Sequence, residues 1–344
     1  MTATLSFIAI IAVIITVHEF GHYLVARLNG VKILTFSIGF GPKLFGWTDR
    51  SGTEWKVCAI PLGGYVRMFG DGVGDSFTDA EKAQAYATKG PLARISILLA
   101  GPAMNFVLAL VLFTGLAMYG QPYQMPQIGS VTAGSPAAVA GLEAGDVAVA
   151  VDGHSLTTAH ELLQLLPTAG QPFVLTVKRN GQLVQLHLSP DAAGHIGITF
   201  AEGATGFTAG KGPLDAAASS AKKTWGMTSA IGSAVVQMVT GQTDASKNVG
   251  GPIAIAREAG QITHAMGFYG LVLFTGFISL NIGLMNLLPV PPLDGGKIFF
   301  ALFELVGLPI PQRLEIAISL LGVLLFLLLM GYSTLLDISR LFGG

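Results

Sequence analysis

The chain has 344 residues, of which 51% are hydrophobic and only 11% are charged, and its formal net charge at pH 7 is −1. Soluble domains carry about 25% charged residues, so this composition indicates a membrane protein, and the near-zero net charge argues against a nucleic-acid partner. The single cysteine, Cys58, excludes an intrachain disulfide and a cysteine zinc cluster, so any zinc must be bound by histidine or carboxylate side chains.

Four apolar stretches are each long enough to cross a bilayer, which takes about 20 residues. They cover residues 4–27, 93–119, 267–288 and 314–336. The first stretch has no Lys or Arg before Arg27 and no small-residue cleavage site. We therefore interpret it as a retained span and not as a signal peptide.

The first stretch contains an H-E-x-x-H motif, His18-Glu19-Phe20-Gly21-His22. Residues four apart lie on one face of a helix, so His18 and His22 can direct their imidazoles to one point, with Glu19 beside them. This arrangement suits a zinc ion held by two histidines, with Glu19 as the general base. Polar side chains that are satisfied by packing against other helices are the alternative explanation.

Basic residues near the ends of the spans predict the orientation, because they gather on the cytoplasmic side. They are Arg27, Lys32, Lys43, Lys82, Lys89, Arg94, Lys297 and Arg313, against Arg257 and Arg340 on the opposite side. We therefore expect residues 28–92 and 289–313 to face the cytoplasm, and both termini and residues 120–266 to face the other side. His18 and His22 would then lie toward the cytoplasmic end of the first span.

Residues 28–92 are rich in glycine and contain two strand-like runs, 55–60 and 65–68. Between the runs, Pro61-Leu62-Gly63-Gly64 is a turn signal, so the pattern predicts a β-hairpin with its turn at this point. Such a hairpin could offer an edge to an extended peptide, or it could be purely structural. Residues 71–89 are expected to form a polar surface loop.

The second span contains Gly101-Pro102-Ala103-Met104-Asn105. Proline in a span frees a backbone carbonyl, and glycine lets another helix approach closely. Asn105 is polar in an apolar environment, so we expect it to face the protein interior. Interhelical hydrogen bonding and a catalytic role both account for it.

Residues 121–190 carry two glycine-rich signatures, S-P-A-A-V-A-G-L from Ser135 and V-D-G from Val151. Further on, two strand-like runs flank Asn180-Gly181, which favours a tight hairpin turn. The segment resembles the PDZ domains of bacterial envelope proteases. A PDZ fold binds an extended chain end by strand addition, so this part is expected to recognise a peptide or protein ligand or to gate access.

A helical and mildly amphipathic pattern covers residues 213–241. We expect a helix along the outer membrane surface or, as the alternative, a linker helix packed on the PDZ domain. Gly250-Gly251-Pro252-Ile253 predicts a turn before the third span.

The third span runs into Asn286-Leu287-Leu288-Pro289-Val290-Pro291-Pro292-Leu293-Asp294-Gly295. Three prolines within four residues cannot continue a regular helix, and irregular backbone at membrane depth must be buried or line a wet cavity. A lone carboxylate there needs a cation, and the two histidines lack a third protein ligand. Asp294 can therefore complete a two-His-one-Asp zinc site with an open water position, although capping a following helix is the alternative.

Together these motifs resemble those of the site-2 protease family, the intramembrane zinc metalloproteases, and are similar to its bacterial RseP-like branch. The resemblance rests on the H-E-x-x-H motif, the Gly101–Asn105 and Asn286–Gly295 segments, Pro61-Leu62-Gly63-Gly64-Tyr65-Val66 and the PDZ segment. It implies Zn²⁺ as the cofactor. The ligands would be His18, His22 and Asp294, and Glu19 would be the catalytic glutamate.

The resemblance also implies how a substrate is held. Asn105 and Asn286 would line the site and help to hold or polarise the substrate. The hairpin around Gly63, Gly64 and Tyr65 would clamp the substrate as an added strand. Substrates would be single-span membrane proteins, of the anti-sigma factor type or remnant signal peptides, in the bacterial cytoplasmic (inner) membrane. The PDZ domain would act as a size filter for segments already shortened by another protease.

Two features depart from that branch. RseP itself carries two tandem PDZ domains, whereas residues 120–266 show a single signature, so size filtering need not work in the same way. Lys297 follows the double glycine after Asp294, where histidine is common in this branch. It is not an expected zinc ligand, so the departure leaves the predicted chemistry unchanged.

The expected fold is a polytopic α-helical membrane protein with four transmembrane helices, a cytoplasmic membrane-associated β-hairpin and an inserted extracytoplasmic α+β PDZ domain. Its expected parts are an N-terminal membrane part (1–119), the PDZ domain (121–200), a helical region (205–266) and a C-terminal membrane part (267–344). A non-proteolytic PDZ scaffold with a structural or relic zinc site is the alternative function. Glu19 argues against it, because a structural zinc site needs no general base. A metal transporter is a weaker alternative, since the third and fourth spans have few polar positions.

Overall fold

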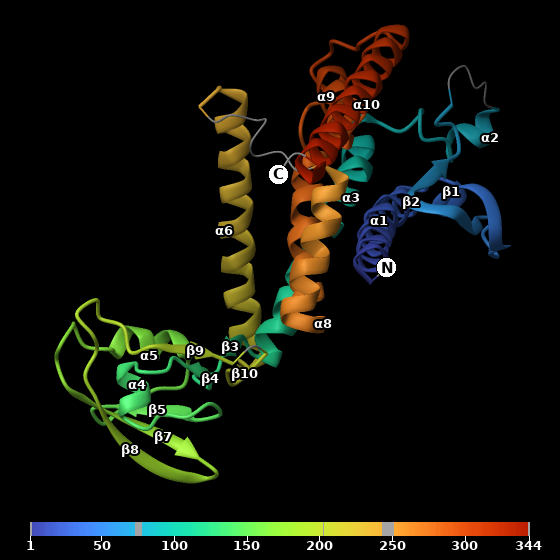
Figure 1. Ribbon diagram of the computed structural model, residues 1–344. Coiled ribbons are helices and arrows are strands. Elements are labelled where there is room, and N and C mark those ends of the chain that lie inside the picture. The colour runs from blue at the N-terminus through green and yellow to red at the C-terminus, as the bar shows by residue number, and fades with distance from the viewer. Residues whose placement is uncertain (1, 73–77, 202, 243–250, 343–344) are drawn as a thin grey trace. The chain divides into compact units, whose positions relative to one another are not determined.

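The structure is a computed structural model that describes residues 2–72, 78–201, 203–242 and 251–342. The chain forms two compact units, and the second is inserted into the first. The first unit consists of the residues up to Ala117 and from Gly212 onward, and the second unit runs from Met118 to Lys211. Figure 1 shows the elements of both units along the chain.

Among the described residues, four helices are long and apolar enough to cross a membrane, so the four predicted spans are confirmed as helices. They are α1 (Thr2–Leu28), α3 (Pro91–Tyr119), α8 (Pro252–Asn286) and α10 (Gln312–Phe342). α8 begins well before the predicted start at residue 267, where Gly267 breaks the helical geometry with a φ of 57°. Glycine has no Cβ to oppose this backbone conformation, so the helix continues on both sides of the kink.

Buried apolar side chains join α8 to both α1 and α3. Ile14 of α1 belongs to one cluster with Phe274 of α8, and Phe113 of α3 belongs to another with Leu280 of α8. Burying such side chains contributes roughly 1.5–3 kcal/mol each in water, and in lipid the same contacts act through close packing. These three helices therefore form the scaffold on which the site is built.

Between α1 and α3 the chain forms a long antiparallel hairpin of β1 (Ile33–Thr48) and β2 (Glu54–Met68). The predicted reversal of the chain at 61–64 is present inside β2, because residues 54–57 and 64–68 both pair with residues 33–38 of β1 but run in opposite directions along it. The two runs therefore flank β1 and do not pair with each other as a simple hairpin would. A second turn follows Asp49, whose Oδ1 accepts hydrogen bonds from the backbone N–H groups of Ser51 and Thr53 at 2.8 and 3.0 Å. An aspartate that bonds the backbone two residues on is a turn signal that the prediction did not use.

The remainder of the first unit consists of shorter or less apolar helices. The predicted polar loop at 71–89 lies partly outside the described residues, and its described part contains α2 (Asp79–Lys82). After α8, the proline-rich segment leads into α9 (Asp294–Leu305). An ion pair between Arg94 of α3 and Glu304 ties the end of α9 to the start of α3.

The predicted helix is present as α6 (Pro213–Val239). Met227 and Ile231 pack into the cluster that contains Phe113 of α3 and Tyr269 of α8. The ammonium of Lys223 also lies over the Phe113 ring, 5.0 Å from its centroid. α6 therefore contacts two of the candidate spans through part of its apolar stripe, while its side chains Leu214, Trp225 and Val236 are exposed. The predicted turn at 250–253 is partly outside the described residues, and Gly251 is the residue before α8.

The second unit is a mixed α/β structure built on a four-stranded antiparallel sheet. The sheet has the order β6 (His154–Ser155), β5 (Val147–Val151), β7 (Phe173–Arg179) and β8 (Gln182–Leu188). The predicted hairpin is confirmed: Arg179 pairs with Gln182, and both Asn180 and Gly181 have positive φ. Its core includes Leu162 of the helix α5 (Ala159–Leu165) and Leu175, both fully buried.

Two smaller strand pairs complete the second unit. β4 (Ile128–Val131) pairs with β9 (Ile198–Phe200), and the short helix α4 (Pro136–Val139) follows β4. β3 (Pro122–Gln124) pairs with β10 (Thr205–Phe207). The second pair joins the first and last strands of the unit, so the two ends of the insertion meet.

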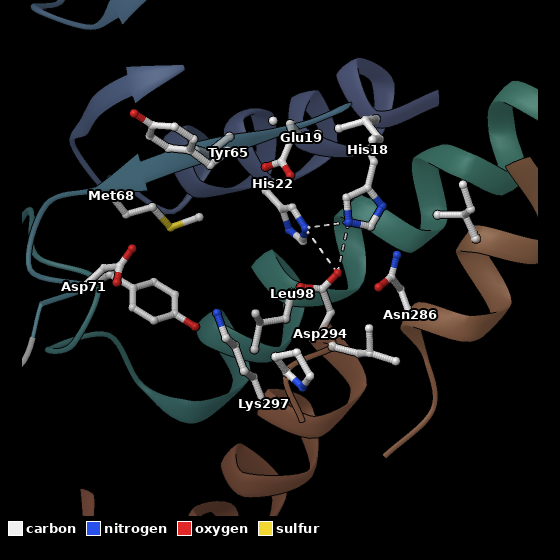
Figure 2. Close-up of a pocket in the computed structure, with 18 residues that line it drawn as sticks. His18, Glu19, His22, Tyr65, Met68, Asp71, Leu98, Asn286, Asp294 and Lys297 are labelled. Carbon is white, nitrogen blue, oxygen red and sulfur yellow. Dashed lines mark hydrogen bonds and ion pairs between the residues drawn. The ribbon is translucent and has the colours of Figure 1, made fainter. Parts of the chain in front are cut away.

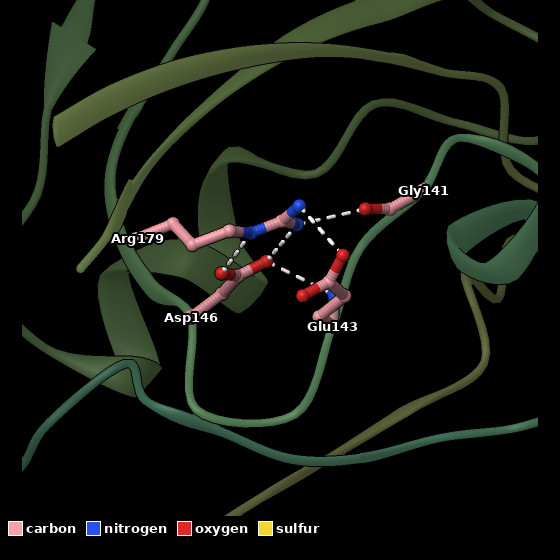
Figure 3. Close-up of polar contacts among 4 residues, drawn as sticks. All are labelled: Gly141, Glu143, Asp146 and Arg179. Atoms are coloured by element: carbon pink, nitrogen blue, oxygen red, sulfur yellow. Dashed lines mark hydrogen bonds and ion pairs between the residues drawn. The ribbon is translucent and has the colours of Figure 1, made fainter.

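Within the second unit, Arg179 at the end of β7 holds the loop before β5 (Figure 3). Its Nε and Nη2 donate to the two carboxylate oxygens of Asp146 at 2.8 and 2.7 Å, and its Nη1 donates to Glu143 at 2.8 Å. Asp146 is only 1% exposed. Burial alone would raise the pKa of Asp146, but the hydrogen bonds and charge of Arg179, together with the backbone N–H of Glu143, outweigh it and hold this pKa below its ordinary value.

Replacing Arg179 with methionine is expected to destabilise the second unit by about 3 kcal/mol, because a buried carboxylate loses its partner. Hydrogen–deuterium exchange of residues 127–188 in the full-length protein measures this as faster amide exchange. The control is Lys178→Met, an exposed neighbour whose effect should stay below about 0.5 kcal/mol. Because the folded pKa of Asp146 is depressed, the difference between wild type and Arg179→Met should be full above about pH 4 and shrink as the pH falls further. Equal exchange in Arg179→Met and wild type at pH 7 would contradict the expectation.

Candidate metal centre

Two histidines of α1 and one aspartate of α9 converge in the first unit (Figure 2). The Nε2 atoms of His18 and His22 lie 3.2 Å apart. The Oδ2 atom of Asp294 lies 3.1 Å from the first and 3.3 Å from the second. Both histidines are buried, so α1 and α9 bring two nitrogen donors and one oxygen donor together away from bulk solvent.

The backbone around the prolines determines where Asp294 points. α8 ends at Asn286, and the following residues turn so that α9 begins at Asp294 itself. The residue before it, Leu293, has no side-chain capping bond. The Asp294 carboxylate is therefore in the first turn of α9, but its Oδ2 atom faces the two histidines.

Helix α3 covers the other side of the histidine pair. The Nδ1 atom of His22 donates to the carbonyl oxygen of Ile97 at 2.8 Å, and Nδ1 of His18 lies 3.2 Å from Nδ2 of Asn105. A Cβ atom on Gly101 would lie 2.8 Å from Nε2 of His18 and closer still to Nε2 of His22. Only glycine therefore lets α3 approach the site this closely, which is the close approach predicted for Gly101.

The donor set fits a divalent metal ion. Nδ1 of His22 must donate, since a carbonyl oxygen can only accept, so Nε2 of His22 carries a lone pair. Oδ2 of Asp294 is buried and faces the Nε2 atoms of His18 and His22 at 3.1 and 3.3 Å. Zinc–ligand bonds of 2.0–2.1 Å in a tetrahedron place ligand atoms about 3.3 Å apart, which matches the three observed separations. The residues thus fit Zn²⁺ in donor type, spacing and burial.

A cavity of about 470 Å³ opens next to the three donor atoms. Glu19 lines it, and so do Asn286, Gly63, Gly64 and Tyr65, as expected for residues near a substrate. Gly64 lies against the stem of Glu19, because an added Cβ would be 3.3 Å from Cγ of Glu19. Val66 of β2 lines the same cavity. The strand β2 thus positions Glu19 at the cavity wall.

Asn105 differs from the expectation that it contacts substrate. Its side chain is fully buried, and it is not among the residues that line the cavity. Its neighbour is His18 instead, because Asn105 and Gly101 lie one helical turn apart on the face of α3 that covers the histidines.

Sequence reasoning missed two cavity residues, Asp71 and Tyr86. Both follow the hairpin in a segment whose only sequence signal was polarity. Burial raises the pKa of the Tyr86 phenol, so Tyr86 keeps its proton as a hydrogen-bond donor. Lys297 also lines the cavity, three residues after Asp294. The helical spacing from Asp294 was the signal that placed Lys297 on the same face of α9.

Comparisons with known proteins agree with this geometry. The model of peptidase family M50 matches residues 6–329. A protein of Brucella suis biovar 1 is 36% identical over 351 residues, covering 95% of this chain and 92% of that protein. A protein of Rhizobium meliloti is 33% identical over 98% of this chain and 96% of its own, and one of Clostridium acetobutylicum is 34% identical over 96% of each. All three bear the name "Putative zinc metalloprotease".

These matches and the apolar helices define a zinc metallopeptidase that is a multi-pass membrane protein. The chain belongs to peptidase family M50, which covers nearly its whole length. The enzyme is therefore a hydrolase of peptide bonds, an intramembrane protease, and zinc is its expected cofactor.

Proposed function

We propose that this protein cuts the membrane-spanning segments of single-span proteins, with His18, His22 and Asp294 as zinc ligands and Glu19 as the general base. The observation that carries the proposal is the convergence of Nε2 of His18, Nε2 of His22 and Oδ2 of Asp294 within 3.3 Å of one another. They come from helices at opposite ends of the chain, and they converge beside a cavity that Glu19 lines. A structural metal site would need neither the cavity nor the carboxylate of Glu19 beside it.

The chain's own residues supply proton transfer and orientation. Bound zinc would act as a Lewis acid on a water molecule and on the peptide carbonyl. Glu19 would take the proton of the attacking water and pass it to the leaving amine. The position of Glu19 in the cavity wall, with its stem against Gly64, supports this role. Asn286, the last residue of α8, would hydrogen-bond the substrate backbone, and its position in the cavity lining supports this role.

The substrate would bind to β2 as an added strand. A transmembrane helix has closed its amides in internal hydrogen bonds, so it must unwind before a peptide bond can be reached. Residues 64–68 of β2 pair only with residues 33–38 of β1 among the described strands, which leaves the second edge of this run available. Gly63, Gly64 and Tyr65 belong to β2 and line the cavity. Strand addition at this edge would supply the backbone partners that the unwound segment needs.

The second unit would be a PDZ domain that selects substrates. Its antiparallel sheet, its two short helices and its tight hairpin at Asn180-Gly181 support that fold assignment. A PDZ domain binds an extended chain end, so it would admit proteins already shortened by another protease and exclude intact ones. Anti-sigma factors and remnant signal peptides are the substrate types that this filter fits.

The enzyme would lie in the bacterial cytoplasmic membrane with its site toward the cytoplasm. The clustering of Lys and Arg in residues 28–92 and 289–313 supports this orientation. Both termini and the second unit would then be extracytoplasmic. Water would reach the site from the cytoplasmic side.

The proposed function is tested by cleavage of tagged single-span proteins with purified enzyme in detergent. Removing zinc with a chelator should abolish cleavage, and adding Zn²⁺ back, but not Mg²⁺, should restore it, because nitrogen ligands favour zinc. Cleavage that persists in protein shown to be free of zinc would contradict a zinc mechanism. No cleavage of any member of a panel of spans by zinc-loaded protein would favour the scaffold function.

A further inference from the structure

The two histidines of the metal centre differ in the hydrogen-bond partner of Nδ1, the ring nitrogen that faces away from the metal site. His22 is held by a backbone carbonyl, that of Ile97, at 2.8 Å. His18 is held by a side chain, the amide of Asn105, at 3.2 Å. A carbonyl oxygen only accepts, so it fixes the proton of His22 on Nδ1. An amide can present either a donor or an acceptor, so the contact of His18 allows two arrangements.

The surroundings of Asn105 leave it little besides His18 to bind. The side chain is 0% exposed, and its buried Oδ1 atom has no hydrogen-bond partner in the part of the chain that the structure describes. Helix α8 confines the residue, since an added Cβ on Gly283 would lie 3.1 Å from Cβ of Asn105. Ser279 of α8 donates to the backbone carbonyl of Asn105 at 2.9 Å and does not hold the side chain. The position of the amide group is therefore confined. Which of its two atoms, Nδ2 or Oδ1, faces His18 is not set by a second hydrogen bond.

We propose that Asn105 is a positioning residue that selects the proton position of His18 according to whether zinc is bound. With Nδ2 toward the ring, as in this structure, Nδ1 of His18 accepts and its proton sits on Nε2, facing Asp294. With the amide turned over, Oδ1 accepts from the N–H at Nδ1, and the lone pair of Nε2 is free for the metal. Metal-binding histidines commonly donate their second N–H to an acceptor of this kind. The proposal rests on the ligand set of the proposed function.

Asparagine suits this position for a physical reason. Leucine has a similar volume but offers no acceptor to Nδ1 of His18. Aspartate offers an acceptor in every orientation, and it would favour the metal-binding form permanently. Asparagine alone among the three serves both forms without placing a charge in a fully buried position. The orphaned Oδ1 is then the acceptor that the zinc-bound form uses.

The test compares the zinc affinity of Asn105→Leu, Asn105→Asp and wild type, each as full-length protein in detergent. Competition with a chromophoric chelator gives the dissociation constant for zinc. Asn105→Leu should bind zinc about 10–100-fold more weakly, the usual cost of losing such an outer hydrogen bond. Asn105→Asp should bind at least as tightly as wild type. The matched control is Ser279→Ala, which removes a buried bond to the same residue's backbone and should leave zinc affinity unchanged.

Three outcomes overturn the proposal. Wild-type affinity in Asn105→Leu would show that His18 needs no acceptor. An equal loss in Asn105→Leu and Asn105→Asp would assign the effect to packing. If the wild type binds no zinc, or if His18→Ala binds zinc as tightly as the wild type, the proposed ligand set itself is overturned. This outcome differs from a failure that concerns Asn105 alone. A ¹⁵N-histidine spectrum of the zinc-loaded wild type should in addition show His18 protonated at Nδ1.

Discussion

Glu19→Gln should reduce cleavage of a single-span substrate by at least about 10²–10⁴-fold, the usual contribution of a general base. Glutamine keeps the size of the side chain, but it cannot take a proton from water. The bound zinc should remain at the wild-type level, because Glu19 is not among the three converging donor atoms. The loss is therefore expected in the chemical step and not in assembly of the site.

The measurement is the initial rate of cleavage in detergent, together with zinc content of the same preparations by mass spectrometry. Glu258→Gln makes the same chemical change at an exposed position on α8 and should cleave at the wild-type rate. Equal rates in Glu19→Gln and wild type would point to a different base. Loss of zinc in Glu19→Gln would instead show that Glu19 belongs to the ligand set.

Asp294→Asn should remove both zinc and activity. The amide oxygen is neutral and binds zinc weakly, so the protein would lose the only anionic donor among His18, His22 and Asp294. Zinc affinity should fall by more than the roughly 100-fold that is the largest usual effect of removing a hydrogen bond to a metal ligand. The variant should still fold, because asparagine has the size of aspartate and its amide oxygen can still accept from the N–H at Nε2 of His18.

Zinc titration with chelator competition measures this effect, and activity assays follow at saturating zinc. Glu304→Gln is the matched control, since it converts a carboxylate to an amide on the same helix, α9, away from the site. This variant loses the ion pair with Arg94 but should keep wild-type zinc affinity. Full zinc retention in Asp294→Asn would remove Asp294 from the proposed ligands.

The metal centre was predictable because it depends on local helix spacing and on a carboxylate whose chemistry leaves few choices of partner. Spacing of four residues on a helix places His18 and His22 on one face whatever surrounds them. Asp294 stands more than 270 residues away from them in sequence, yet proline-broken backbone at membrane depth leaves a carboxylate few acceptable partners except a cation. The pairing therefore followed from chemistry without knowledge of the packing.

Other features depend on tertiary packing and could not be read in the same way. The hairpin region reverses direction at 61–64, as the proline-glycine sequence indicates, and also after Asp49, whose carboxylate accepts from two backbone N–H groups. The apolar positions of α6 were visible, but the packing of Met227 and Ile231 against α3 and α8 was not. Asn105 was expected in the interior, and only the rotation of α3 relative to α1 shows that its neighbour is His18.

The pairing of β3 with β10 has a consequence for the evolution of this protein. Tyr123 opposite Gly206 brings the beginning and the end of the second unit into one strand pair, and Thr208 and Gln121 continue it by a backbone bond of 2.9 Å. An insertion whose ends meet can be gained, lost or duplicated in one recombination event, because the host helices need only a short bridge. The second unit and the membrane part that carries the metal centre can therefore have separate histories, and relatives can exchange the first while retaining the second.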